Sequence, residues 1–267
     1  MEKLRYFFTQ SKFGRFWIKA RFQYLLMALA MYGLKAVLYF IIAYIPCHPV
    51  TFGDPNIDYF SGPYAMAIDN AIPLVSYFYF FYVLYYVVPE IMLWILSFFD
   101  RKKVITIVVA CASATILACI CYLIQQVKMI RPEAYVGQYH DFSKVHDLNT
   151  FLLWAIDKQY IADETALNCF PSLHATVGMA LALCGIWTGK DEKHFPIGLR
   201  IFCGLFGAGI IMSTFFVKQH YFIDSVVGAS LMAILYFVYK LFIIPPFKRR
   251  REEKLNKLVE EETPVEN

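Results

Sequence analysis

Six long apolar stretches dominate this chain of 267 residues. They cover residues 22–46, 72–98, 104–127, 171–188, 198–217 and 221–244. A helix of about 20 apolar residues crosses the hydrocarbon core of a bilayer, where it satisfies its own backbone hydrogen bonds. The composition agrees, because 59% of the residues are hydrophobic and only 17% are charged, against about 25% charged in soluble domains. We therefore expect an all-α integral membrane protein, folded as a six-transmembrane-helix bundle.

The rest of the chain suggests one membrane domain with two polar ends. Residues 1–21 form a basic, aromatic segment that is typical of an interfacial helix, residues 22–246 hold the six spans, and residues 247–267 form a charged tail. The N-terminal segment lacks the short apolar region and small-residue cleavage site of a signal peptide. We expect the first apolar stretch to remain as an anchor.

The distribution of Lys and Arg predicts the orientation. Eighteen of these residues lie in the two terminal segments and the loops 99–103 and 189–200, whereas five lie in the loops on the opposite side. Short loops rich in Lys and Arg stay in the cytoplasm. Both termini are therefore expected to be cytoplasmic, and the basic inner face suggests contact with anionic lipid and not with nucleic acid.

Three compact polar patches fall on the extracytoplasmic or lumenal side, each at the end of an apolar stretch. They are "KMIRP" at residues 128–132, "FPSLHA" at residues 170–175, and "FVKQHYFID" at residues 216–224 with Ser213 just upstream. Loops that join packed helices bring such ends together. The sequence therefore predicts one shared pocket on that face.

The third patch contains a histidine and a carboxylate with helical spacing. His220 and Asp224 are four residues apart, so on a helix they would share a face. A carboxylate on one imidazole nitrogen fixes the tautomer and leaves the other nitrogen available as a nucleophile or base.

The other two patches offer an acid and groups that bind anions. His174 lies in the first turn after Pro171 and could protonate a leaving oxygen, while Ser172 and the free N–H groups there suit an anion. Arg131 offers a planar fork that matches phosphate oxygens. Further positive charge is available from Lys128 and Lys218. The set predicts phosphoryl transfer without a metal or other cofactor.

These residues resemble the motifs of the type-2 phosphatidic acid phosphatase superfamily, which are K-x6-RP, PSGH and SR-x5-H-x3-D. The matching positions are Arg131 and Pro132, then Pro171, Ser172 and His174, then Ser213, His220 and Asp224. The resemblance implies that His220 takes the phosphoryl group, Asp224 orients it and His174 is the general acid. It also implies that the remaining residues hold phosphate.

The chain departs from the family pattern at three positions. Ile124 stands at the lysine position, Thr214 follows Ser213 in place of arginine, and Leu173 replaces glycine. The chain thus lacks two cations of the family's phosphate site, which Lys128 and Lys218 could replace. In this respect it resembles the inositol phosphorylceramide synthase-like branch, which includes phosphotransferases.

We therefore expect a multi-pass membrane phosphatase of an amphipathic lipid phosphate, in a bacterial plasma membrane with its site outside the cytoplasm. A lipid phosphotransferase with an alcohol acceptor is the alternative within the family. A non-catalytic lipid-phosphate-binding protein and an anion transporter are alternatives from other classes. A transporter would need polar residues at mid-membrane depth in several spans, and few are present.

Three further features stay open. His220, Asp224 and His174 would also suit a zinc or manganese ion. Cys47 and Cys169 both lie near the outer face and could pair. The sequence does not name the lipid, the acceptor or the oligomeric state.

Lys35 carries a charge midway along the first apolar stretch, where a charge is costly and is normally paired. Glu90 in the second stretch is a candidate partner, although it lies nearer the inner face. We expect both side chains to lie far from the outer motifs and to have a structural role.

Overall fold

The computed structural model describes residues 11, 17–43, 50–51, 63–124, 126–129, 131, 137–163, 168–186 and 195–245. The α-helices are α3 (Phe22–Ala43), α4 (Pro63–Ala71), α5 (Tyr79–Leu84), α6 (Val88–Ser97), α7 (Arg101–Ile124), α8 (Leu148–Ala162), α9 (Leu173–Gly185), α10 (Ile197–Phe216) and α11 (Phe222–Val238). Shorter helical turns are η1 (Ser76–Phe78), η2 (Phe142–Lys144) and η3 (Tyr239–Ile243).

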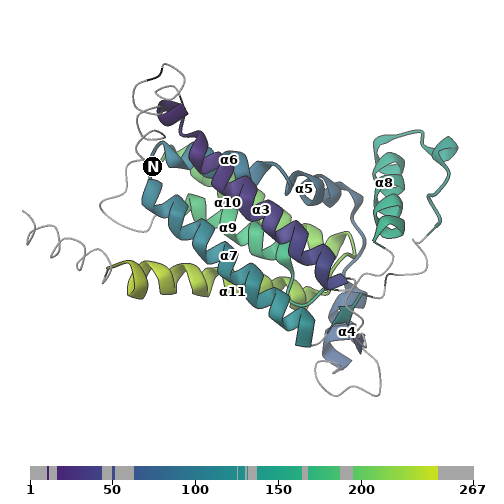
Figure 1. The fold of residues 1–267 in the computed structure, drawn as a ribbon. Helices are drawn as coiled ribbons and strands as arrows, with labels where there is room; N and C mark the ends of the chain where they lie inside the picture. The colour runs from purple at the N-terminus through teal and green to yellow at the C-terminus, as the bar shows by residue number, and fades with distance from the viewer. Residues whose placement is uncertain are drawn as a thin grey trace, which may run out of the picture.

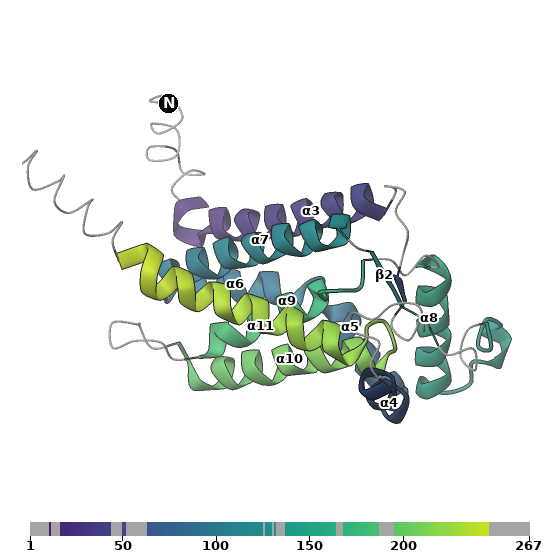
Figure 2. The ribbon, with the colours of Figure 1, turned by 90° about the horizontal axis from the view of Figure 1, so that it is seen from below.

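The long helices run side by side as a bundle, with α9 at its centre (Figure 1). α9 packs against α6, α7, α10 and α11, and α3 packs against α6 and α7. At one end of the bundle α8 lies across the direction of the long helices, and α4 and β2 lie at that same end (Figure 2). Strand β2 (Val127–Lys128) pairs in parallel with β1 (Val50–Thr51), with Val50 opposite Val127.

The bundle has an apolar interior and an apolar exterior. Its buried core includes Ile107, Leu181 and Met232. Large apolar side chains also point outward, among them Leu205 at 70% and Ile234 at 61% exposed. Such an exterior suits contact with lipid chains, because these do not penalise exposed apolar groups as water does.

Within the described residues, four helices are long and apolar enough to cross a membrane: Phe22–Tyr39, Arg101–Ile124, Ile197–Phe216 and Phe222–Ile243. These match the first, third, fifth and sixth apolar stretches.

The second stretch is broken. Its two parts, Ser76–Leu84 and Val88–Ser97, are bent by 47° and would make a fifth span only if counted together. Pro89 lies in the first turn of α6, where the lack of an N–H group and the fixed φ are tolerated, whereas within a continuous helix they would not be. The break therefore falls just before this proline.

The fourth stretch is shorter as a helix than its apolar sequence suggested. α9 has 13 residues, which at 1.5 Å per residue gives about 20 Å, less than the roughly 30 Å hydrocarbon core. Four or five spans are therefore supported by length and composition, and the six-span arrangement and the orientation stay predictions. Residues 246–267 and most of 1–21 lie outside the described residues.

Glycines allow α9 to approach its neighbours closely. A Cβ on Gly207 of α10 would lie 2.5 Å from the carbonyl oxygen of Gly178 in α9. A Cβ on Gly228 of α11 would lie 2.2 Å from the carbonyl oxygen of Ser172, just before α9. Small residues permit this kind of contact between membrane helices.

Replacement of Gly228 by alanine should destabilise the protein, because the new methyl group meets the backbone of Ser172, which cannot rotate away. We expect the free energy of unfolding to fall by about 1–3 kcal/mol, the usual cost of overpacking. A lower thermal unfolding midpoint in detergent would show this. Gly204→Ala in α10 is the matched control, since a Cβ there meets no atom within 4 Å. Equal midpoints for the two variants would contradict the close contact.

Candidate active site at one end of the bundle

A tight turn after α10 brings the chain back into α11. The N–H of Gln219 donates to the carbonyl oxygen of Thr214 at 2.9 Å, and the N–H of Lys218 donates to that of Phe215 at 3.3 Å. Lys218 has a φ of +53°. These are the two hydrogen bonds and the left-handed residue of a Schellman motif, and they place His220 between the two helices.

His220 and Asp224 are together, although not on one helix. His220 precedes α11, and Tyr221 is the residue that caps this helix. The Asp224 Oδ2 atom accepts a hydrogen bond from the Tyr221 N–H at 3.0 Å and lies 3.5 Å from His220 Nδ1. The carboxylate therefore reaches His220 because it folds back over the start of α11, and not through a shared helix face.

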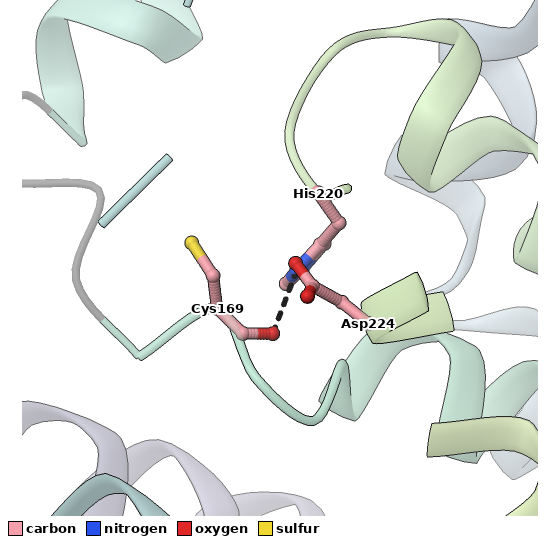
Figure 3. Close-up of side chains that lie close together, drawn as sticks. All are labelled: Cys169, His220 and Asp224. Atoms are coloured by element: carbon pink, nitrogen blue, oxygen red, sulfur yellow. Dashed lines mark hydrogen bonds and ion pairs between the residues drawn. The ribbon is translucent and has the colours of Figure 1, made fainter. Parts of the chain in front are cut away.

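The Nδ1 atom of His220 faces two oxygen atoms. Besides Asp224, it lies 3.1 Å from the carbonyl oxygen of Cys169, which Figure 3 shows facing the His220 ring. An Nδ1–H donor between these oxygens leaves Nε2 with its lone pair, since a neutral imidazole has one donor and one acceptor nitrogen. This arrangement suits a nucleophilic Nε2.

The start of α9 is docked on the start of α11. The Ser172 N–H donates to the Asp224 carbonyl oxygen at 3.0 Å, and the Tyr122 hydroxyl of α7 donates to the Pro171 carbonyl oxygen at 2.6 Å. Ser172 is the N-cap of α9, and its hydroxyl accepts from the Ala175 N–H at 3.2 Å. These contacts fix the position of His174, two residues further on.

His174 is held between tyrosine rings and faces His220. Its ring centroid lies 4.6 Å from that of Tyr82 in a stacked arrangement and 4.1 Å from that of Tyr85. The His174 and His220 ring centroids are 5.6 Å apart. His174 of α9 and His220 of the turn before α11 thus lie close together.

A cavity of about 260 Å³ adjoins the two histidines. Both histidines line it, together with Lys35, Asn168 and Gln219. Six tyrosines also line it: Tyr32, Tyr39, Tyr82, Tyr85, Tyr86 and Tyr122. The walls therefore combine aromatic surface with a few polar groups, as ligand pockets commonly do.

Several buried polar atoms of these lining residues have no hydrogen-bond partner within the described part of the chain. They are Nε2 of His174, both side-chain polar atoms of Asn168, and Nε2 of Gln219. Buried polar groups are normally hydrogen-bonded. A polar ligand in the cavity would satisfy them.

Arg131 was predicted to bind phosphate. In the structure its guanidinium group forms hydrogen bonds with protein atoms instead. The group donates to the carbonyl oxygens of Tyr160 at 2.8 Å and Asp163 at 2.6 Å. It also donates to the Asp163 carboxylate at 2.7 Å and to the Gln219 side chain at 2.9 Å. Arg131 thereby ties the end of α8 to the turn before α11.

Lys218, also predicted to hold phosphate, turns toward α4 and is not among the cavity residues. Its ammonium donates to the Asp69 carbonyl oxygen at 2.6 Å, while the Asp69 carboxylate accepts from the Phe222 N–H at 2.8 Å. Burial raises the pKa of the Asp69 carboxyl above its ordinary value, and the Phe222 N–H and Lys218 oppose this. The contacts between Lys218 and Asp69 and between Asp69 and Phe222 thereby attach α4 to the start of α11.

Ser172 and Ser213, two further predicted phosphate ligands, are not among the residues that line the cavity. Ser172 caps α9, and the Ser213 hydroxyl donates to the Ile210 carbonyl oxygen at 2.6 Å. The backbone of Lys128 belongs to β2, and its side chain lies outside the described residues. Cys47 is likewise not described, so its pairing with Cys169 stays a prediction.

One group of side chains could hold a metal ion. The ligand atoms of Cys169, His220 and Asp224 all lie within 4.8 Å of one another. This set has Cys169 where the sequence suggested His174. An ion bound to Nδ1 of His220 would replace the proton that this nitrogen shares with the Cys169 carbonyl oxygen and the Asp224 carboxylate.

The sequence analysis missed the contribution of α3. Lys35 lines the cavity with both histidines, so the expectation that it lies far from the outer motifs was wrong. Tyr32, Lys35 and Tyr39 are spaced by three and four residues, which places them on one helix face. This polar stripe on an otherwise apolar helix was the signal that could have identified α3 as part of the site.

The model of one protein family matches residues 60–238, which is more than half of the chain, and its description is the PAP2 superfamily. No curated protein and no solved structure matches the chain.

Replacement of Arg131 by glutamine should loosen the attachment of α8. The change removes an ion pair and two hydrogen bonds to backbone carbonyl groups. We therefore expect the free energy of unfolding to fall by about 2–3 kcal/mol. This is less than for a fully buried pair, because Asp163 is partly exposed. Thermal unfolding in detergent measures this loss. Lys144→Gln, at an exposed position before α8, should leave the midpoint unchanged, and an equal effect of both changes would refute the anchoring role.

Proposed function

Because the chain belongs to the PAP2 superfamily, we propose that it is a membrane phosphatase of an amphipathic lipid phosphate that acts through a phosphohistidine intermediate. The observation that carries this proposal is the pair of histidines that line one cavity, with the Nδ1 atom of His220 beside the Asp224 carboxylate. One histidine is thereby oriented as a nucleophile, and the other is free to act as an acid.

In the first step, Nε2 of His220 attacks the phosphorus atom while the bond to the lipid oxygen breaks. The leaving oxygen takes a proton from His174, which also lines the cavity. Asp224 stabilises the positive charge that the imidazole ring of His220 acquires. The products of this step are a lipid alcohol and a phosphohistidine.

In the second step, water gives a proton to His174 and attacks the phosphohistidine. The P–N bond breaks, inorganic phosphate leaves, and His220 returns to its neutral state. The acid of the first step serves as the base of the second, so the cycle needs no other proton carrier.

The phosphate ligands proposed from the sequence are Arg131, Ser172, Ser213, Lys218 and Lys128. Of these, Arg131 has a contact that leads to the cavity, because it hydrogen-bonds Gln219, which lines the wall. Arg131 would therefore act on a phosphate group in the cavity indirectly, by holding the Gln219 side chain in position.

A lipid phosphotransferase of the inositol phosphorylceramide synthase-like branch is the second candidate. Asn168 favours it, because both polar atoms of this buried amide lack partners among the described residues and the side chain lines the cavity. An amide of this kind would bind the hydroxyl of an acceptor alcohol, which would then replace water in the second step.

We also propose that the cavity opens to the extracytoplasmic side of a plasma membrane, in a bacterium. The support is the excess of Lys and Arg in the loops expected at the other side, which cytoplasmic loops carry in membrane proteins.

The proposed reaction predicts that purified protein in detergent with EDTA releases phosphate from a panel of lipid phosphates. His220→Ala should abolish release, because no nucleophile remains. His174→Ala should lower it by about 100-fold or more, within the range for loss of a general acid. His146→Ala is the matched control, since this histidine is exposed in the loop before α8, and it should retain full activity.

Full turnover by the His220→Ala protein would refute the phosphohistidine mechanism. Release that requires a divalent ion would favour a metal at Cys169, His220 and Asp224. Phosphoryl transfer to an added polyol with little free phosphate would identify the transferase, and binding without either product would identify a non-catalytic protein.

A further inference from the structure

Lys35 is a buried cation in the wall of the cavity. It lies on α3, is 5% exposed, and shares the cavity with His174 and His220. α3 precedes residues 60–238, which the family model matches. The role of Lys35 in the site therefore comes from a part of this chain that the family model does not match.

Aromatic groups hold the ammonium group beside the candidate acid. Lys35 Nζ donates a hydrogen bond to the Tyr85 hydroxyl and lies 4.7 Å and 4.1 Å from the ring centroids of Tyr32 and Tyr85. The Tyr85 ring in turn contacts His174. Lys35 is thus fixed on the His174 side of the cavity.

The charge of Lys35 has no carboxylate in contact. Across the described ranges, no acidic side chain lies within 4.0 Å of Lys35 Nζ. Glu90, its candidate partner from the sequence, is buried in α6 with one carboxylate oxygen unpartnered and does not line the cavity. Glu90 lies near enough to interact electrostatically with Lys35, but a buried ammonium without a carboxylate in contact is costly, and cation–π contacts offset only part of that cost.

Two other candidate cations with described side chains, Arg131 and Lys218, form contacts elsewhere. Arg131 binds the end of α8, and Lys218 binds α4. Ile124, at the position of the family lysine, is 78% exposed on the outside of α7. Thr214, at the position of the family arginine, forms a hydrogen bond with Ser225. Among the described residues that line the cavity, Lys35 is the one Lys or Arg.

We propose that Lys35 binds the phosphate group of the substrate directly and supplies the positive charge that the motif positions of this chain lack. This inference rests on the proposed function and assigns a ligand for its phosphate.

The chemistry of the ammonium group suits this role. It has three N–H donors, and the Tyr85 hydroxyl takes one of them. The other two remain for phosphate oxygens in the cavity, which Lys35 and both histidines line. A fixed positive charge in a space of low polarity stabilises the negative charge that builds on these oxygens during phosphoryl transfer.

The test compares Lys35→Met with Lys103→Met. Both changes remove a buried lysine amine, but Lys103 is on α7 and donates to the Ile186 carbonyl oxygen at the end of α9, away from the cavity. Each protein is purified in detergent, and the thermal unfolding midpoint is measured with and without inorganic phosphate. The kcat and KM for lipid-phosphate hydrolysis are measured in parallel.

We expect phosphate to raise the midpoint of the wild type and of Lys103→Met but not that of Lys35→Met. We also expect kcat/KM to fall by about 100-fold for Lys35→Met, as for the loss of one group that stabilises developing charge, and to stay within about twofold for Lys103→Met. Lys35→Arg, which keeps the charge, should recover part of the phosphate effect.

If phosphate raises the unfolding midpoints of the wild type and Lys35→Met equally, the proposal is overturned. It is also overturned if phosphate does not raise the midpoint of the wild type. If Lys35→Met does not fold, Lys35→Gln replaces it under the same criterion, because glutamine keeps a hydrogen-bonding group for Tyr85. The two proposals fail separately: a wild type that binds phosphate through Lys35 but hydrolyses no lipid phosphate refutes the proposed function alone.

Discussion

The hydrogen bond from the Ser172 N–H to the Asp224 carbonyl oxygen joins the starts of α9 and α11. The rest of the site depends on this contact, because His174 follows Ser172 by two residues and His220 precedes Asp224 by four. A single hydrogen bond contributes only about 1 kcal/mol. Its position matters more than its energy, and Gly228 lets the two backbones approach closely enough to form it.

The short helix α9 and the break between α5 and α6 both contribute residues to the cavity. α9 is central, and its N-terminal turn carries His174, which lines the cavity. The break between α5 and α6 places Tyr85 in the turn before Pro89, from where it contacts both His174 and Lys35. Irregular backbone at membrane depth is tolerated where it is buried in protein or lines a cavity.

The cations near the site divide into two kinds. Arg131 and Lys218 satisfy backbone carbonyl groups at the ends of α8 and α4, which fixes these two helices at the end of the bundle. Lys35 contacts aromatic groups and faces the cavity. A cation whose donors are used by carbonyl groups has little left for a ligand, whereas one held by rings keeps its charge and donors available.

The sequence by itself determined the helical membrane fold, since long apolar stretches have few other solutions, and it determined His220, Asp224 and His174 as a candidate group through their spacing and motifs. It could not show how His220 reaches Asp224, because that contact comes from a turn and a helix start and not from helical periodicity. It also could not show that Lys35 belongs to the site while Lys218 points away. Only the tertiary structure decided this, because the packing of α3 against α6 and α7 sets which side chains face the cavity.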